Sequence, residues 1–231
     1  MCGRYTLATP SPAAIRERFP LGEAVQITPR FNIAPGDEVL AVTTDREGTA
    51  RGELLRWGLV PSWAQSPETG LKMINARVET VASRPAFRQA FERFRCLIIA
   101  DGFYEWRALP DGRKQPFHIA RGDGEPFAFA GLWSSWRRDG REPLRTCTIL
   151  TTAANATVAP LHDRMPVILA PDAERPWLDQ RTPPEALAGL LGGLSAAGTA
   201  VRAVDSVVND AGYDGPACLA PPSAGEQPAL F

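Results

Sequence analysis

The second residue of the chain, Cys2, becomes a candidate nucleophile if the initiator Met1 is removed. Methionine aminopeptidases remove Met1 when the next residue is small, and Cys is small enough. Cys2 would then carry an α-amine and a thiol two carbons apart, with ordinary pKa values of about 8 and about 8.5. Such an aminothiol condenses with an aldehyde, first to a Schiff base and then to a thiazolidine ring. The alternative is a Cys2 without a chemical role, because Met1 is retained or the thiol is idle.

A second candidate is Glu105, which stands between Tyr104 and Trp106 just after a short apolar run. Aromatic neighbours exclude water from a carboxylate, which raises its pKa and lets it exchange a proton near neutral pH. The alternative is an exposed glutamate in a loop, and the local sequence does not choose between the two.

The two histidines of the chain differ in their surroundings. His162 lies in a polar turn before an apolar segment, where Asp163 or Arg164 could tune it for general acid–base catalysis. A surface histidine with no task is the alternative interpretation. His118 alternates with apolar neighbours in a predicted strand, so we interpret it as structural.

Polar and aromatic residues elsewhere could bind a ligand. The amide of Asn75 could hold a substrate or the N-terminus, and the guanidinium of Arg77 could clamp a phosphate. The alternative is a turn residue and a solvated charge. Pro61 ends a predicted strand and leaves Trp63 on a loop, where the indole could stack on a base, although tryptophans more often fill cores.

These residues must be positioned by many short elements. Ser11 can cap a helix over residues 12–19, and Pro12 suits its first position. The apolar run at residues 96–100 is typical of a strand buried on both sides. Other helices are expected at 85–93, around 177–178 and at 184–192; other strands are expected at 39–44, 53–60, 73–81, 116–120, 127–133, 146–152 and 201–204. The pattern predicts an α+β, mainly β, single domain of short, mostly antiparallel strands with a few peripheral helices.

Composition narrows the class of protein. The 231 residues are 44% apolar and 22% charged, with a net charge of −1. Four scattered cysteines and two histidines argue against a zinc site or a disulfide scaffold, so we expect no metal and no cofactor. No apolar run approaches the ~18 residues of a membrane span, and no signal peptide follows Met1. We therefore expect a cytoplasmic protein with no membrane partner.

The net charge alone argues against a nucleic-acid partner, but the basic residues are unevenly placed. Residues 71–95 contain six basic side chains and two acidic ones, which permits a groove of local positive potential. The basic residues are Lys72, Arg77, Arg84, Arg88, Arg93 and Arg95.

Six segments, taken in order, resemble the SOS-response-associated peptidase (SRAP) family of abasic-site processing proteins. Their order is more specific than any one of them, and the resemblance spans residues 2–219. The segments are Cys2-Gly3-Arg4-Tyr5, Arg30-Phe31-Asn32-Ile33-Ala34-Pro35, Trp57-Gly58-Leu59-Val60-Pro61, Ile74-Asn75-Ala76-Arg77-Val78-Glu79-Thr80, Asp101-Gly102-Phe103-Tyr104-Glu105-Trp106 and His162-Asp163-Arg164-Met165-Pro166.

The resemblance implies a DNA repair enzyme of a peptidase/hydrolase and lyase-like class. Members bind single-stranded DNA and junctions with duplex, and the N-terminal Cys2 forms a covalent thiazolidine with the ring-opened aldehyde of an abasic site. By the matching motifs, Asn75 would position the N-terminus or sugar, Glu105 would transfer protons, and His162 would assist ring opening and reversal. The implied DNA-binding residues are Arg4, Asn32, Trp57, Trp63, Arg77, Arg84, Pro116 and Phe117.

The resemblance also predicts the organisation of the chain. We expect one domain over residues 2–219, a flexible tail over 220–231, a monomer, and association with the nucleoid when DNA is bound. The final motif, residues 208–216, departs from the family at 211–213, where a basic residue is usual, so a phosphate contact there is in doubt. An associated autocatalytic peptidase activity is also implied.

Two other functions remain open at this point. An N-terminal-nucleophile cysteine amidohydrolase would use Cys2 to attack an amide and would be indifferent to DNA. A non-catalytic module would bind single-stranded DNA without ever cross-linking to it.

Overall fold

The structure is a computed structural model that describes most of the chain. The described residues are 2–8, 12–22, 25–45, 47–138, 140 and 142–223. Ser11, the predicted helix cap, and residues 224–231 of the predicted tail lie outside them.

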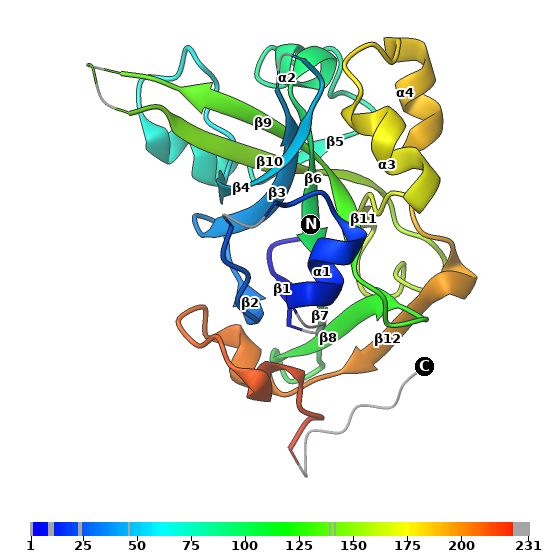
Figure 1. The fold of residues 1–231 in the computed structure, drawn as a ribbon. Helices are drawn as coiled ribbons and strands as arrows, with labels where there is room; N and C mark the ends of the chain where they lie inside the picture. The colour runs from blue at the N-terminus through cyan, green and yellow to red at the C-terminus, as the bar shows by residue number, and fades with distance from the viewer. Residues whose placement is uncertain are drawn as a thin grey trace.

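Strands dominate the described chain (Figure 1). They are β1 (Tyr5–Leu7), β2 (Arg30–Ile33), β3 (Glu38–Thr44), β4 (Ala50–Trp57), β5 (Asn75–Arg77), β6 (Arg95–Ala100), β7 (Gly102–Ala108), β8 (Lys114–Arg121), β9 (Phe127–Trp136), β10 (Leu144–Ala153), β11 (Arg164–Pro166) and β12 (Thr199–Ala203). The α-helices are α1 (Pro12–Arg18), α2 (Arg88–Arg93), α3 (Pro171–Leu178) and α4 (Pro184–Leu190), and the 3₁₀ helices are η1 (Pro67–Lys72), η2 (Ala196–Gly198), η3 (Ser206–Asn209) and η4 (Pro216–Leu219).

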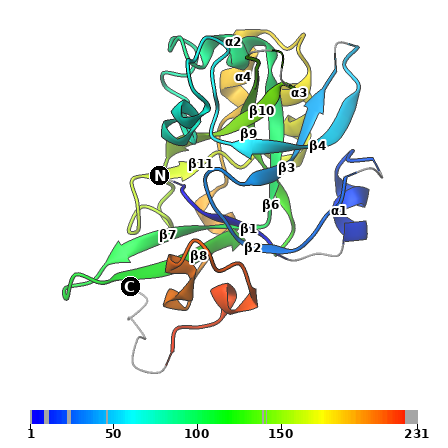
Figure 2. The same cartoon turned by 90° about the vertical axis from the view of Figure 1, so that its left-hand side faces the viewer.

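The strands form two sheets. The first has the order β12-β8-β7-β1-β2, and all its pairs are antiparallel. The second has the order β11-β10-β4-β3-β6-β9 and closes on itself because β9 also pairs with β10. In Figure 2 the second sheet and helices α2, α3 and α4 lie above the first sheet, while η3 and η4 lie below it. This architecture confirms the predicted α+β, mainly β, domain.

The core lies between the sheets and is centred on β6. Every residue of β6 is buried, as its continuous apolar sequence predicts. Its one charged member, Arg95, donates hydrogen bonds to the carbonyls of Phe91 (2.8 Å) and Glu92 (2.7 Å) near the end of α2. It also donates to the carbonyls of Trp177 (2.7 Å) and Asp179 (2.6 Å) at the end of α3. Helix carbonyls carry partial negative charge, so the buried guanidinium joins both helix ends to the sheet.

Within the first sheet, a buried polar cluster joins β1 to β8 and to the residue before β7. Thr6 donates a hydrogen bond to the carboxylate of Asp101, and its hydroxyl lies 3.0 Å from Nε2 of His118. The carboxylate can only accept, so the hydroxyl uses its one proton on Asp101. The hydroxyl oxygen then accepts a hydrogen bond from the N–H at Nε2 of a neutral His118. Gly102 permits the contact, since a Cβ there would lie 2.1 Å from Nε2 of His118. Burial lowers the pKa of His118 to about 4, so its imidazole is neutral at physiological pH.

Some predicted boundaries were too long. The strand expected at 73–81 is limited to β5, whose three residues pair in parallel with β10, and hydrogen-bonded turns follow it. The helix expected at 85–93 begins only at Arg88.

No helix among the described residues is long and apolar enough to cross a membrane.

Candidate functional site

Cys2, the first described residue, is completely buried at the start of the chain segment that becomes β1. Its carbonyl accepts a 2.7 Å hydrogen bond from the side-chain amide of Asn75 on β5. Its thiol donates weakly to the carbonyl of Arg4 at 3.8 Å. Burial, and next the negative charge of Glu105, raise the pKa of the Cys2 thiol well above its ordinary value. The sulfur is therefore a neutral thiol until a base removes its proton.

Glu105 lies on β7, opposite Phe117 of β8, and only 4% of its surface is exposed. Burial raises the pKa of its carboxyl from 4.5 to about 7. Near neutral pH the side chain is thus present both as the carboxylic acid, which can donate a proton, and as the carboxylate, which can accept one. The structure therefore contains the predicted desolvated carboxyl, and its charge acts on the thiol of Cys2.

His162 follows the turn at residues 158–161 and precedes β11. Its Nδ1 accepts a 2.9 Å hydrogen bond from the backbone N–H of Arg164, which leaves the proton of a neutral imidazole on Nε2. Burial lowers the pKa of His162 and favours this neutral form. The exposed carboxylate of Asp163 also lies 2.9 Å from Nδ1, a contact that becomes a hydrogen bond only when the imidazole is protonated.

A cleft of about 520 Å³ brings Glu105 and His162 together, although 57 residues separate them in the chain. We call it the reaction cleft. Cys2 and Asn75 are not among the residues that line it; Asn75 lies on β5, where its Oδ1 is buried and has no hydrogen-bond partner among the described residues. The reaction cleft is lined by Arg4, Glu105, Trp106, Lys114, His162 and Asn209.

Arg4 lines the reaction cleft, and hydrogen bonds to Asn32 and Val208 hold its guanidinium in place. Its Nη1 donates to Oδ1 of Asn32 at 2.9 Å and to the carbonyl of Val208 at 3.0 Å. The amide of Asn32 in turn donates to the carbonyls of Val208 (3.2 Å), Asp210 (2.9 Å) and Tyr213 (2.8 Å). The loop after η3 and the N-terminal segment are thereby joined through one buried side chain.

The predicted DNA-binding residues divide by exposure. Trp63, Arg77 and Arg84 are exposed and Arg4 is half-buried, so all four have accessible surface. They remain candidate DNA contacts.

The other four predicted contacts are buried, and their DNA-binding role stays a prediction. Asn32 is 1% exposed and holds the loop just described. Trp57 is fully buried on β4, and its Nε1 donates to the carbonyl of Ile74 at 2.9 Å. Pro116 and Phe117 are buried in β8, where the guanidinium of Arg107 lies 4.9 Å from the Phe117 ring. Motif matching gave their positions in the chain but not the face of the strand that each occupies.

The sequence interpretation missed several residues of the site. Trp106 donates from Nε1 to Oδ1 of Asn209 at 2.7 Å across the reaction cleft, and Lys114 lies beside them. The guanidinium of Arg164 forms a bidentate pair with Glu79 at 2.6 and 2.9 Å. Lys114 follows a turn and Asn209 lies in the final motif, and neither carries a local signal that singles it out.

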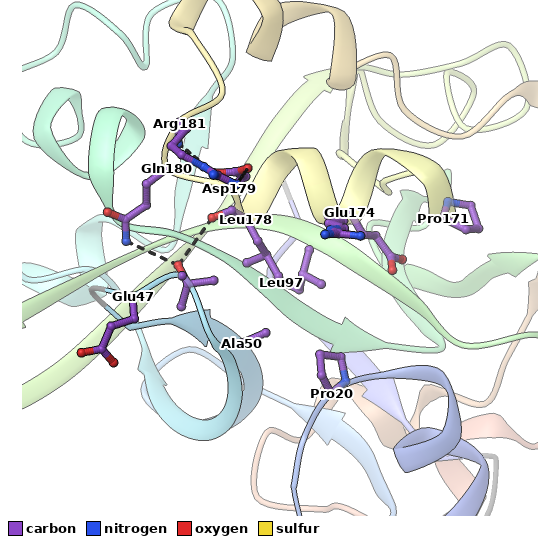
Figure 3. A pocket seen from close by; sticks show the side chains of 13 residues that line it. Pro20, Glu47, Ala50, Leu97, Pro171, Glu174, Leu178, Asp179, Gln180 and Arg181 are labelled. Carbon is purple, nitrogen blue, oxygen red and sulfur yellow. Dashed lines mark hydrogen bonds and ion pairs between the residues drawn. The ribbon is translucent and has the colours of Figure 1, made fainter.

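A second cleft, of about 610 Å³, lies at the end of α3 (Figure 3). Two of its acidic residues form ion pairs: Glu174 with Arg18 at 2.6 Å, and Asp179 with Arg181 at 2.8 Å. No predicted site residue lines it. Among the described residues, no group of three or more His, Cys, Asp or Glu side chains is placed to hold a metal ion.

Comparison with known proteins identifies the family of the chain. The family profile of the SOS response associated peptidase (SRAP) matches residues 1–211. The chain belongs to the SRAP family. It is similar to the abasic site processing protein YoaM of Bacillus subtilis, with 43% identity over 90% of this chain and 93% of that protein. It is also similar to the abasic site processing protein YedK of Escherichia coli, with 37% identity over 65% of each chain.

Solved structures share the fold of this SRAP chain. A phage-related protein from Bordetella bronchiseptica superimposes with a TM-score of 0.72 at 30% identity, covering 89% of this chain and 95% of that one. A protein from Bacteroides thetaiotaomicron gives a TM-score of 0.81 at 23% identity, covering 95% and 99%, and shows the fold alone.

Proposed function

We propose that this protein is a DNA repair enzyme that shields abasic sites in single-stranded DNA and at junctions with duplex. After removal of Met1, Cys2 forms a thiazolidine with the ring-opened aldehyde of the abasic sugar. The observation that carries the proposal is the placement of Cys2: Asn75 holds its carbonyl at 2.7 Å, and its thiol lies within the electrostatic influence of Glu105. The names of the similar proteins support abasic DNA as the substrate.

The reaction needs a base and an acid in turn. The free α-amine of Cys2 attacks the aldehyde carbon, and the aldehyde oxygen takes up a proton. Loss of that oxygen as water leaves a Schiff base. The thiol then adds to the carbon of the C=N bond, its proton passes to a base, and the ring closes. Aldehyde and aminothiol thus give thiazolidine and one water.

Glu105 suits both proton transfers because its pKa of about 7 keeps acid and carboxylate populated together. The acid protonates the departing hydroxyl, and the carboxylate accepts the proton of the thiol, whose raised pKa makes a base necessary. His162, with its proton on Nε2, donates to the sugar ring oxygen when the ring opens. The same transfers in reverse release the DNA.

Asn75 acts by orientation. Its Nδ2 fixes the carbonyl of Cys2, and its buried Oδ1 can accept a hydrogen bond from the α-amine or from a sugar hydroxyl. Holding the aminothiol against a bound aldehyde replaces a bimolecular encounter by an intramolecular one, where effective molarities reach ~10⁵ M or more. Arg4, Trp63, Arg77 and Arg84 bind the strand on either side. The protein acts as a monomer in the cytoplasm, associated with the nucleoid when bound.

The direct test is adduct formation on a denaturing gel. Wild-type protein is incubated with a labelled single-stranded oligonucleotide that carries one abasic site, beside an undamaged oligonucleotide of the same sequence. A shifted band that survives denaturation is expected with the abasic strand alone. Cys2→Ala keeps an α-amine after Met1 removal and lacks the thiol, so it should give no such band unless a reductant traps the Schiff base. A stable adduct of Cys2→Ala without reductant would refute the thiazolidine.

The gel result, together with an amide-substrate assay and a DNA-binding assay, distinguishes the two other candidate functions. An amidohydrolase would acylate Cys2 with amide substrates and leave abasic DNA unmodified. A non-catalytic module would bind the strand equally well as wild type and as Cys2→Ser, and would never shift in the denaturing gel.

A further inference from the structure

The reaction cleft contains two positive side chains that take no part in the proposed proton transfers. Lys114, at the start of β8, is exposed and forms no ion pair among the described residues. Both hydrogen bonds that hold Arg4 use Nη1, so the N–H groups on Nε and Nη2 are left for a ligand. Glu105 is the one acidic residue among the described residues that line the cleft. The cleft is therefore suited to a small molecule that carries negative charge.

The same cleft has an aromatic wall. Trp106 is half-buried, and its Nε1 donates to Oδ1 of Asn209 at 2.7 Å, which fixes the position of the indole. The C–H groups on the face of a sugar pack on an aromatic ring by dispersion. This bond occupies Oδ1 of Asn209 and leaves its exposed Nδ2 to donate to a hydroxyl. An indole face beside an amide donor is suited to a sugar.

The acid–base groups of the cleft act on a sugar ring whether or not DNA is attached to it. The neutral imidazole of His162 carries its proton on Nε2, where it can protonate the ring oxygen of a cyclic sugar. Glu105 lines the cleft, and its charge acts on the thiol of Cys2. The volume of about 520 Å³ is within the ~300–1,000 Å³ of sites that hold small ligands. Neither the chemistry nor the space requires a polymer.

The two cations favour phosphate as the charged group. A phosphate ester carries a charge of about −1.5 to −2 near neutral pH and offers three acceptor oxygens. It can therefore accept from the ammonium of Lys114 and from the guanidinium of Arg4 at the same time.

We infer that the reaction cleft also captures free aldose phosphates, which are small sugars that carry one phosphate and open to an aldehyde. The sugar lies on Trp106, the phosphate binds Lys114 and Arg4, and the aldehyde carbon reacts with Cys2. The inference deepens the proposed function and rests on its aminothiol chemistry. A free aldose phosphate is a second class of substrate, and its capture consumes the group that abasic DNA needs.

The reaction balances without a co-reactant. In ring opening, the ring oxygen gains a proton from His162 and the hydroxyl on the neighbouring carbon loses one, so the sugar is only isomerised. The α-amine of Cys2 then bonds to the aldehyde carbon, and the aldehyde oxygen leaves as water. The sulfur adds to the same carbon, and its proton passes through Glu105 to the ring nitrogen. Aldose phosphate and aminothiol give thiazolidine and one water.

The test follows adduct formation by intact mass with protein that lacks Met1. The probes are deoxyribose that carries a phosphate on its terminal carbon and plain deoxyribose at the same concentration. Each rate is divided by the rate of the same sugar with free cysteine, because the phosphate prevents closure to the larger ring and raises the fraction of aldehyde. We expect an adduct equal to protein plus sugar phosphate minus one water. The corrected rate should be about tenfold higher for the sugar phosphate, as expected for one charge-assisted contact.

Variants of the two lysines of the chain identify the phosphate contact. Lys114→Ala should lose most of the preference for the sugar phosphate, and Lys114→Arg should keep it. The matched control is Lys72→Ala, at an exposed position on η1 outside the reaction cleft, which should also keep the preference. Cys2→Ala should give no stable adduct with either sugar. Equal corrected rates for the two sugars with the wild type would overturn the inference, and so would an equal preference in Lys114→Ala and Lys72→Ala.

An abasic oligonucleotide, tested with the same wild-type preparation, separates this inference from the proposed function. Cross-linking of the oligonucleotide without a preference for the sugar phosphate would overturn the inference and leave the proposed function standing. An adduct with the sugar phosphate at the expected preference, together with unmodified oligonucleotide, would refute the proposed function and support the inference.

Discussion

The buried carboxyl of Glu105 should make the folded protein less stable as the pH rises from 4.5 to 7. The pKa of Glu105 is about 7 in the folded protein and 4.5 as an ordinary glutamate. Between these values the folded state keeps a proton that the unfolded state has released. Since the pKa is raised on folding, the stabilisation is complete below pH 4.5 and is lost as the pH rises through 7.

The size of the effect follows from the shift. Each pKa unit corresponds to 1.36 kcal/mol, so the free energy of unfolding should fall by about 3 kcal/mol across this range. A domain of this size is stable by about 5–15 kcal/mol, and a change of 3 kcal/mol shifts Tm by roughly 6–12 °C. The loss is therefore large enough to measure.

The assay is urea unfolding of the wild type and of Glu105→Gln at intervals from pH 4 to pH 9, with the same N-terminus in both proteins. Other carboxyl groups contribute equally to both curves, so the difference between them isolates Glu105. We expect the wild type to lose about 3 kcal/mol relative to the variant. Glu17→Gln, at an exposed site on α1, is the control and should differ from wild type by no more than about 0.5 kcal/mol at any pH. A difference between wild type and Glu105→Gln that does not change with pH would refute the assignment of a raised pKa.

Three further substitutions test how the site and the sheets are held. Asn75→Ala removes the bond to the N-terminal carbonyl and should slow cross-linking about 10–100-fold on a gel time course, while binding of undamaged DNA stays at wild-type strength. Arg95→Met leaves helix carbonyls without a donor and should cost about 3 kcal/mol or more in urea unfolding; an unchanged midpoint would contradict its role. Thr6→Val leaves Asp101 and His118 without their shared hydroxyl and should lower the unfolding free energy by about 1–3 kcal/mol, whereas an undiminished Tm would show that water replaces it.

Local sequence predicted the strands and helices well where one physical signal was strong. The apolar run of β6 is buried along its whole length, and the prolines at the starts of α1 and α4 mark those helices. The closure of the second sheet was not predictable, because it depends on β10. That strand pairs in parallel with β4 and β5, which lie far away in the chain, and no local pattern records such partners.

The candidate site was predicted in part. Residue type and motif singled out Cys2, Asn75 and Glu105; in the structure Asn75 bonds the carbonyl of Cys2, and the charge of Glu105 acts on its thiol, while their chemical roles stay a prediction. The DNA-contacting surface was less predictable. Trp57 belongs to a matching motif and is fully buried on β4, because a motif gives a residue's place in the chain but not which face of the strand is covered.

The proposed reaction also requires that Cys2, which is buried, be the N-terminal residue. Its carbonyl is fixed and its thiol is enclosed; in the proposed reaction the α-amine at that position must also be free, because only a free amine forms the Schiff base. A retained Met1 or an N-terminal tag converts the amine to an amide and should abolish cross-linking while leaving DNA binding intact.

Intact mass of the purified protein, with and without an abasic oligonucleotide, tests the central claim most directly. The account predicts a protein that lacks Met1 and an adduct equal to that protein plus the DNA minus one water. Unchanged protein mass after incubation, once loss of Met1 has been verified, would contradict the account.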